Sequence, residues 1–270
     1  MRLTAGVATG VAAALLLVLS GCGGDDPPSA QDDPDEPRPA LRGSLVLDFE
    51  SGPRAGQTVE AVTNEGTEQV EVVVADAESA RIESVEGPDG GHAVRFPAYT
   101  GEAVAPAAVL VVAGEEAGPL SPAERDFEFG ATFELDPESS GSQADDGDNL
   151  LQRGSFSDPA QYKIQLDDGV PSCRVAGDAG VVFVEADEAV DPGAWYSVSC
   201  RREGAEVTLT VTPYADRDDA ESWRAGGPTG TLTFGDQPLS VGGKVDAAGV
   251  PVASADQFNG AVDDVYLRIG

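Results

Sequence analysis

Short stretches in which apolar and polar residues alternate run from residue 44 to the C-terminus, and they constrain the fold more than any other feature. Three of them are 127–135 (FEFGATFEL), 207–212 (VTLTVT) and 265–269 (VYLRI). Successive side chains of a strand point to opposite faces, so this pattern predicts strands with one face in a core and one in water. Gly, Pro, Asp and Asn separate the stretches at short intervals, where turns are expected.

The number and spacing of these stretches predict an all-β fold. About fourteen strands is more than an immunoglobulin-type sandwich uses. No segment has the pattern of a three-turn helix, and no internal repeat suggests a propeller. We therefore expect one two-sheet antiparallel jelly-roll sandwich over residues 44–270. The other expected strands are 45–50, 68–74, 80–85, 92–96, 108–112, 149–156, 162–166, 172–176, 181–185, 195–202, 231–234 and 239–244.

Residues 1–21 have the organisation of a lipoprotein export signal. Arg2 precedes an apolar stretch, 5–19, which has the length of a signal-peptide core and is short for a membrane span. It ends in 19–22 (LSGC), which resembles the bacterial lipobox at every position. This predicts a lipid on Cys22 and a place on the outer face of the cell membrane, reached by the general secretory route. The alternative is an ordinary signal peptide with a nearby cysteine.

Residues 22–43 are expected to be a disordered tether that begins at the lipidated cysteine. Pro, Asp and Gly dominate 23–42, and almost nothing there can be buried in a core. Such a segment does not offset the entropy lost on ordering, so it stays extended and solvated. The jelly roll would then be held away from the membrane surface.

The two remaining cysteines, Cys173 and Cys200, are expected to form a disulfide. An even pair in an exported domain is typical of a disulfide, which stabilises by about 3 kcal/mol for a loop of this length in the chain-entropy model. The alternative is two buried free thiols. The sequence contains no CxxC pair and no zinc-type spacing of Cys and His.

The charge balance argues against a nucleic-acid partner. The chain has 48 acidic and 16 basic residues, a formal net charge of −32. Only Lys163 and Lys244 are lysines. A surface of this sign repels nucleic acid and other anionic polymers. We interpret most of the acidic residues as a solvated exterior.

Four stretches together resemble laminin-G-like, concanavalin-A-like jelly-roll domains, especially those of secreted actinobacterial proteins. The resemblance covers residues 120–270 well and 44–119 loosely, and it implies a two-sheet jelly roll with Cys200 as the partner of Cys173. Relatives of this kind mostly bind glycans, proteins or cell-surface polymers, and some are glycoside hydrolases or polysaccharide lyases. The stretches are 120–122 (LSP) with 125–131 (RDFEFGA), 149–154 (NLLQRG) through 162–167 (YKIQLD) to 172–174 (SCR), 195–200 (WYSVSC), and 258–265 (FNGAVDDV).

A search for catalytic residues predicts a protein that is not an enzyme. Hydrolases that share the resembled fold carry Glu-x-Asp-x-x-Glu on one strand, and the nearest match, 185–190 (EADEAV), has Val190 in place of the last Glu. The single histidine, His92, lies in a Gly-rich turn without an Arg-rich strand beside it. The alternatives to a binding module are a carbohydrate-active enzyme of the same fold and a structural envelope protein.

Three acidic residues suggest a calcium site. Asp263 shares the parity of the apolar residues at 265–269, which predicts that it faces inward, and a buried carboxylate needs donors or a cation. Asp48 and Glu50 are expected on the first strand, which in the resembled fold runs beside the last. We therefore expect Ca²⁺ near Asp48, Glu50 and Asp263. The alternative is that Asp263 accepts backbone N–H groups and fixes a loop.

The expected function is non-catalytic binding, with a glycan, a cell-envelope polymer or a surface protein as the ligand. Carbohydrate binding needs exposed aromatic rings with a few polar groups. Trp223 lies in 215–227, which is expected to be a polar loop, so we expect its ring to be exposed and predict it as the ligand-binding residue. Trp195 begins a predicted strand beside the cysteines and is expected in the core.

Overall fold

All secondary structure in the described part of the chain is β-strand, which confirms the all-β prediction. The computed structural model describes residues 41–270 except 102–106, 114–117, 119, 140–147 and 253–255. Ala40–Gly270 forms one compact unit. None of the described residues belongs to a helix long and apolar enough to cross a membrane. The strands are β1 (Leu45–Leu47), β2 (Thr58–Val59), β3 (Ala61–Val62), β4 (Glu71–Ala77), β5 (Ile82–Glu86), β6 (His92–Arg95), β7 (Ala107–Ala113), β8 (Phe127–Leu135), β9 (Asp148–Arg153), β10 (Gln161–Asp167), β11 (Val170–Gly177), β12 (Gly180–Glu185), β13 (Trp195–Glu203), β14 (Glu206–Pro213), β15 (Glu221–Gly226), β16 (Leu239–Val241) and β17 (Gly260–Ile269).

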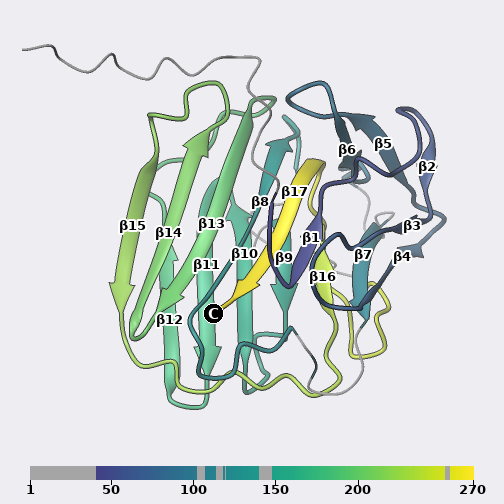
Figure 1. The fold of residues 1–270 in the computed structure, drawn as a ribbon. Helices are drawn as coiled ribbons and strands as arrows, with labels where there is room; N and C mark the ends of the chain where they lie inside the picture. Colours follow the sequence, from purple (N-terminus) through teal and green to yellow (C-terminus); the bar gives the residue numbers. More distant parts are fainter. Residues whose placement is uncertain (1–40, 102–106, 114–117, 119, 140–147, 253–255) are drawn as a thin grey trace, which may run out of the picture. The chain divides into compact units, whose positions relative to one another are not determined.

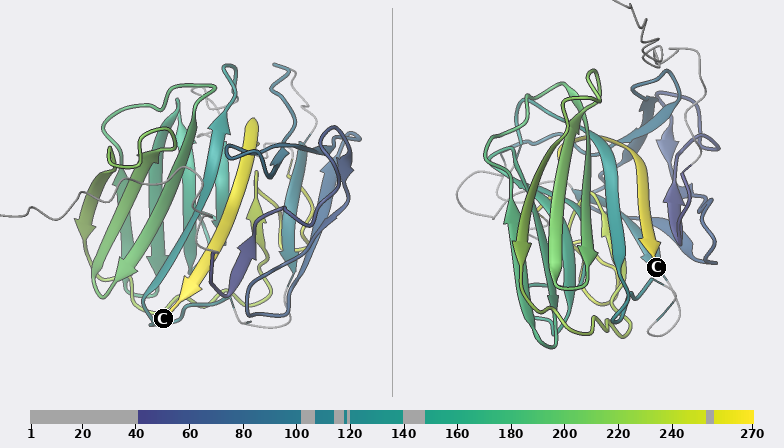
Figure 2. Two further views of the ribbon diagram at one scale, coloured as in Figure 1. Left: turned by 45° about the horizontal axis from the view of Figure 1, so that its top comes forward. Right: turned by 60° about the vertical axis from the view of Figure 1, so that its left-hand side comes forward.

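These strands form two antiparallel sheets that face each other, as the sequence predicts (Figure 1). Sheet A has the order β15-β14-β13-β8-β17-β6-β5-β2, and β1 also pairs with β17. Sheet B has the order β12-β11-β10-β9-β16-β7-β4-β3. The views in Figure 2 show the two layers from the side. Each sheet therefore has one face toward the other sheet and one face away from it.

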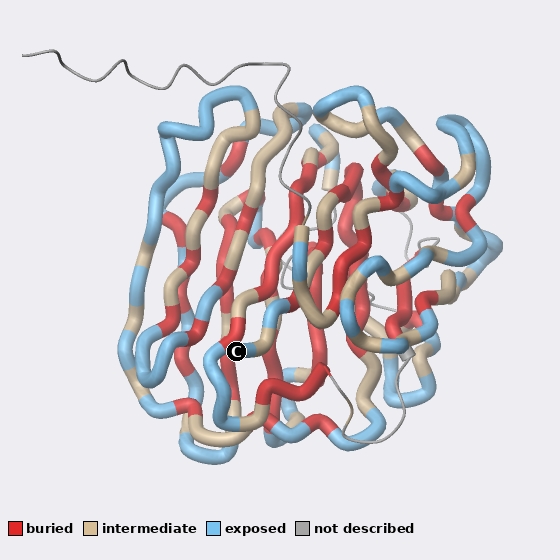
Figure 3. The backbone as a smooth tube through the Cα atoms, in the orientation of Figure 1, coloured by how far each residue is buried: buried red, intermediate tan, exposed pale blue. Residues whose placement is uncertain are grey.

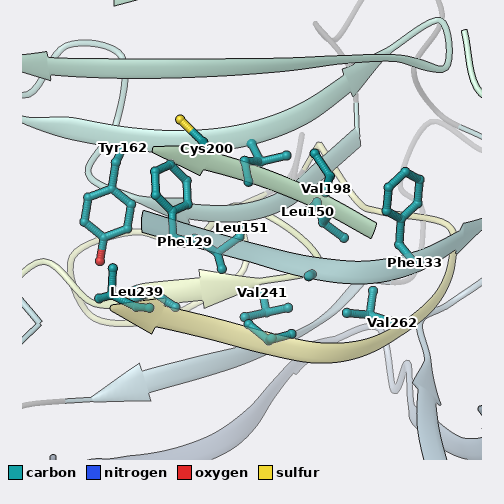
Figure 4. Close-up of a cluster of buried hydrophobic side chains, with 14 of the residues drawn as sticks. Phe129, Phe133, Leu150, Leu151, Tyr162, Val198, Cys200, Leu239, Val241 and Val262 are labelled. Carbon is teal, nitrogen blue, oxygen red and sulfur yellow. The ribbon is translucent and has the colours of Figure 1, made fainter. Parts of the chain in front are cut away.

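The core fills the space between the two sheets. Buried residues alternate with partly or fully exposed ones along outer strands such as β12 and β14, whereas β9 is buried throughout (Figure 3). Phe129 of β8 packs against Tyr162 of β10, with ring centroids 4.9 Å apart, so the two sheets interdigitate (Figure 4). Burial raises the pKa of Tyr162 to about 12, because the ionised phenolate would lose its hydration in the core. Full burial of side chains of this size makes the inter-sheet contact the main source of stability.

The Cys173–Cys200 disulfide is present and joins β11 of sheet B to β13 of sheet A. The two Cα atoms are 6.0 Å apart, which is the normal span of a disulfide. Both cysteines are fully buried in the core. The bond therefore links the two layers covalently through the middle of the sandwich.

The boundaries of several strands differ from the sequence-based expectation. The predicted strand at 231–234 is absent, and Leu232 makes only an isolated bridge to Ala123. The expected loop at 215–227 contains β15, an edge strand whose residues are mostly exposed. Trp223 and Ala225 of β15 are only partly buried against the core, so the alternation in this strand is weak, and its backbone pairs with β14. The strands β2 and β3 were also missed, because a strand of two residues is too short to show an alternating pattern.

Replacing both Cys173 and Cys200 by Ala should lower the free energy of unfolding by about 3 kcal/mol, because the unfolded chain regains the entropy of an open loop. Urea denaturation of the wild type and the double variant measures this difference. The wild type in a reducing agent serves as the matched control and should approach the variant. A double variant within about 0.5 kcal/mol of the oxidised wild type would contradict a stabilising role.

Candidate functional site

A groove of about 740 Å³ lies on the face of sheet B that points away from the core. Its position follows from the alternation on β10. Tyr162, Ile164 and Leu166 are buried in the core, so the residues between them face outward. A groove of this volume is within the range of small-molecule and oligosaccharide-sized sites. We call it the sheet B groove; the lining residues that matter below are Gln152, Phe156, Lys163, Ser172, Arg174 and Phe183.

Four of these side chains form a row across four neighbouring strands. Phe183 of β12 pairs with Arg174 of β11, and Arg174 pairs with Lys163 of β10. Lys163 in turn pairs with Gln152 of β9. Directly opposed residues have Cβ atoms about 5 Å apart. The register thus places an aromatic ring, two cations and an amide side by side on one surface.

Arg174 is the half-buried cation at the centre of the groove. Its Nη1 donates a hydrogen bond to Oε1 of Gln161, and its guanidinium carbon lies 4.8 Å from the centroid of the Phe156 ring. No Asp or Glu of the described residues lies within ion-pair distance of it. Desolvation lowers the pKa of Arg174, which shows that its charge is partly removed from water.

Two phenylalanines stand exposed beside this cation. Phe156, in the connection between β9 and β10, has 81% of its surface exposed. Phe183, on the edge strand β12, has 48% exposed. Large apolar side chains exposed together around polar groups are typical of a contact surface for a ligand.

Ser172 is a buried polar group without a visible partner in the groove wall. Only 1% of its surface is exposed, and its Oγ makes no hydrogen bond within the described residues. A hydroxyl left unsatisfied in this way costs stability. Because Ser172 lines the groove, a ligand there can supply the missing partner.

The groove also holds acidic side chains. The Lys244 ammonium group lies 2.8 Å from Oδ2 of Asp256, and Nδ2 of Asn149 donates to the same oxygen at 3.2 Å. This ion pair is locally neutral. Asp167, at the end of β10, adds one further carboxylate to the lining. The cations Lys163 and Arg174 occupy the row described above.

The predictions from the sequence did not include this groove, although the positions of the two lysines pointed to it. Lys163 and Lys244 are the only two lysines of a strongly acidic chain, and both line the sheet B groove. The strand 161–167 (QYKIQLD) was correctly expected to alternate, and its polar residues are the outward ones. Their meeting with Phe156 and Phe183 depends on pairing between strands, which composition does not reveal.

Trp223 lies on β15, so its placement in a loop was wrong. Its side chain is partly buried and packs against the core. The indole Nε1–H donates to Oδ2 of Asp187 at 3.0 Å. Trp223 is not among the residues of the sheet B groove. A role for it in ligand binding stays a prediction.

The three carboxylates of the expected calcium site each receive a backbone N–H group. The N–H of Glu50 donates to Oδ1 of Asp48 at 3.2 Å, and that of His92 donates to Oε1 of Glu50 at 3.0 Å. The N–H of Asp264 donates to Oδ1 of Asp263 at 2.7 Å. Asp48 and Glu50 follow the end of β1 rather than lying on it, although β1 does pair with β17.

Asp263 is buried, but the predicted inward orientation was wrong. Val262 pairs with Phe133, and both are in the core, so Asp263 points to the opposite side of sheet A. The register shifts between Asp263 and Tyr266, and Asp264 has a left-handed φ of 51°. This β-bulge inserts one residue and reverses the alternation. The parity of the residues after the bulge therefore does not apply to Asp263.

The described residues do not favour the expected calcium site. No three or more His, Cys, Asp or Glu side chains within the described ranges are grouped to hold a metal ion. Asp263 and Glu50 instead accept hydrogen bonds from backbone N–H groups, as in the alternative in which a carboxylate fixes a loop. We derive no chemistry from Ca²⁺, and its binding remains an untested prediction. Cys22, the predicted lipidation site, lies outside the described residues.

Residues 149–269 match the family model of the Laminin G domain. This match confirms the resemblance to laminin-G-like jelly-roll domains, and it includes β10, β11 and β12, which carry most of the groove. No curated protein matches the sequence.

Several solved structures have a similar fold at low sequence identity. The binding domain of Paraclostridial Mosquitocidal Protein 1 has a TM-score of 0.54 and 13% identity over 83% of this chain and 48% of that chain. Domain 4 of AbnA, an extracellular arabinanase from Geobacillus stearothermophilus solved with arabinotriose, has a TM-score of 0.51 and 11% identity over 84% and 92%. The enzymatically active domain of bacteriophage CBA120 tailspike protein 2 has a TM-score of 0.51 and 12% identity over 82% and 30%.

At such low sequence identity, these similarities show a shared fold and nothing about function. The chain spans less than half the length of the mosquitocidal and tailspike structures that it matches. Binding domains and an enzymatic domain both occur among the similar structures. The choice between these functions must therefore come from the groove itself.

Changing Ser172 to Ala should leave the free energy of unfolding unchanged or raise it by about 1 kcal/mol, because it removes a buried hydroxyl without a partner. Ser240→Ala is the matched control, since Oγ of Ser240 is also buried and donates to the carbonyl of Gln152 at 3.4 Å. The control should lose up to about 1 kcal/mol. Equal losses in urea denaturation would mean that Ser172 has a stabilising partner.

Proposed function

We propose that this protein is a non-catalytic binding module that holds a glycan in the sheet B groove. The observation that carries this proposal is the exposure of Phe156 and Phe183 beside Arg174, in a groove that is also lined by amide and cationic groups. A sugar ring offers apolar C–H faces and a rim of hydroxyl groups. Such a ligand needs flat apolar surfaces together with several hydrogen-bonding groups, which is the combination in this groove.

Polar side chains beside the rings supply the directional contacts. Gln152 and Gln165 face the groove from β9 and β10, and each amide has both donors and acceptors. The hydroxyl of Ser172 adds a further donor. Sugar hydroxyls both donate and accept, so amides are suited to them without a fixed charge. The arabinanase domain solved with arabinotriose is consistent with glycan binding by this fold and no more than that.

The alternative function is a carbohydrate-active enzyme of the same fold. Glycoside hydrolysis usually needs two carboxyl groups that flank the scissile bond. The acidic residues that line the groove are Asp167 and Asp256, and Asp256 is held by Lys244 and Asn149. This arrangement favours binding over hydrolysis. A structural envelope protein is the third possibility, and it requires neither a ligand nor turnover.

We further propose that a lipid on Cys22 holds the domain on the outer face of the cell membrane. The support is the apolar segment 5–19 followed by 19–22 (LSGC). A ligand-binding domain in this position would contact polymers or proteins of the cell envelope or its surroundings. The net charge of −32 disfavours a nucleic acid as that partner.

Changing Cys22 to Ala should release the protein from the membrane, because the thiol that accepts the lipid is lost. Fractionation of a bacterial host that lipidates proteins, followed by detection in membrane and soluble fractions, measures the effect. Ser20→Ala keeps a small residue before the cleavage site and should remain in the membrane fraction. Equal membrane association of Cys22→Ala and the wild type would contradict the anchor.

Changing Phe156 or Phe183 to Ala should weaken glycan binding about tenfold in Kd, because each removes a ring that covers a sugar face. The full chain, purified in a mild detergent, is screened on a glycan array, and the best ligand is titrated by calorimetry. Tyr99→Ala is the control, since Tyr99 is also exposed but lines a different pocket.

The same preparation is tested for release of reducing sugars. Binding that is weakened by the two phenylalanine variants, without product release, supports the binding module. Product release would favour the enzyme instead. Absence of binding to any glycan, or binding unaffected by both variants, would contradict the proposed site.

A further inference from the structure

We infer that the glycan held by the sheet B groove is an acidic one, with a carboxylate on its sugar rings as in a polyuronate, and that Arg174 binds this carboxylate. The inference rests on the proposed function, since it assumes that the groove takes a glycan. It goes further in assigning the chemical class of that glycan and the side chain that recognises it.

The partners of Arg174 differ from those of the ion-paired cations of the chain, and unlike Arg153 and Arg202, which also have no ion pair with a described carboxylate but are buried, it is only half-buried, in the groove. Arg95 lies between Glu134, at 2.7 Å, and Asp136, and Arg268 lies 3.1 Å from Glu128. Arg174 instead contacts the neutral Gln161 and the ring of Phe156. Within the described residues it has no carboxylate, although the chain has 48 acidic residues. A guanidinium group is a fork of donors that matches a carboxylate, so a ligand carboxylate fits this position.

The neighbours of Arg174 favour the same ligand. Ser172 lies on the same face of β11, two residues away, and its buried Oγ has no partner in the described structure. Lys163 is directly opposite Arg174 in the register of β10 and β11. A carboxylate placed on Arg174 would therefore lie beside a second cation and near a free hydroxyl donor. Hydrogen bonds of this kind, with a charged partner, are stronger than neutral ones.

The aromatic rings narrow the ligand to a sugar acid. Polyol phosphates carry their charge on an acyclic chain with no ring face beside it, and the net charge of −32 disfavours nucleic acid. In a uronate, the ring that carries the carboxylate also has C–H faces, which Phe156 and Phe183 can cover. The row Phe183–Arg174–Lys163 places ring and charge on adjacent strands. A single sugar acid can therefore place its C–H face against Phe183 and its carboxylate on Arg174.

The net charge of −32 opposes an anionic ligand, so the inference requires the cation in the groove to outweigh that repulsion. The value of −32 is a sum over the chain, whereas Arg174 places in the groove a cation that has no carboxylate partner among the described residues. The Lys244–Asp256 pair is locally neutral, and Asp167 is the remaining carboxylate of the lining. Densely charged polymers would meet the acidic surface around the groove. A ligand with one carboxylate for each sugar would be repelled less than a densely charged polymer.

The test compares hexasaccharides of galacturonate, mannuronate and glucuronate with the methyl esters of the same compounds, in which a methyl group replaces each negative charge. Calorimetry uses the full chain in detergent at fixed salt. We expect at least one acid to bind about tenfold more tightly than its ester. Arg174→Gln should remove this preference, so that acid and ester bind the variant with Kd values within about twofold of each other, and Arg174→Lys should retain part of it. Arg224→Gln, on an exposed strand of sheet A, is the matched control.

The outcomes separate this inference from the proposed function. Equal affinity for acid and ester, or a preference that survives Arg174→Gln, would overturn the inference and leave glycan binding intact. Binding of neutral glycans alone from the array would do the same. If no acidic, esterified or neutral saccharide binds, the proposed function fails and the inference fails with it.

Discussion

The contact between two antiparallel sheets is the constraint on which the rest of the structure depends. Apolar side chains such as Phe129 of β8 and Tyr162 of β10 meet in the middle, and the Cys173–Cys200 disulfide joins the layers at the same level. Because a strand alternates its side chains with a period of two, each inward residue fixes its neighbours outward. The core thereby determines which residues can form a site on the outer faces.

The sheet B groove is a direct consequence of this alternation. With Tyr162 and Ile164 in the core, Lys163 must face outward, and the pairing of β10 with β11 then places Arg174 beside it. These strands also carry the inter-sheet core, so the polar row stands on a rigid support. Sites on strands are held more accurately than sites on loops. Of the groove residues discussed, Phe156, Lys244 and Asp256 come from connections between strands.

The sequence was sufficient for the fold class but not for every element. Alternation identified β8, β14 and the second half of β17, because each buries one face against the core. It failed for β15, which buries little, and for Asp263, because a bulge at Asp264 reverses the pattern in the middle of a strand. Such a bulge is set by backbone geometry and leaves no periodic signal. The candidate site was missed because its residues meet through strand pairing. The exposure of Phe156 and Phe183 also leaves no signal in the sequence, so Trp223 was predicted instead.

The central claim is that a glycan lies in the sheet B groove between Phe156 and Phe183. A crystal structure of the protein with the best ligand from the glycan array tests it most directly. The account predicts sugar rings against one or both phenylalanine rings, with a polar group of the sugar within hydrogen-bond distance of Arg174. Sugar bound instead at Trp223, or near Asp48 and Asp263, with the groove empty, would contradict it.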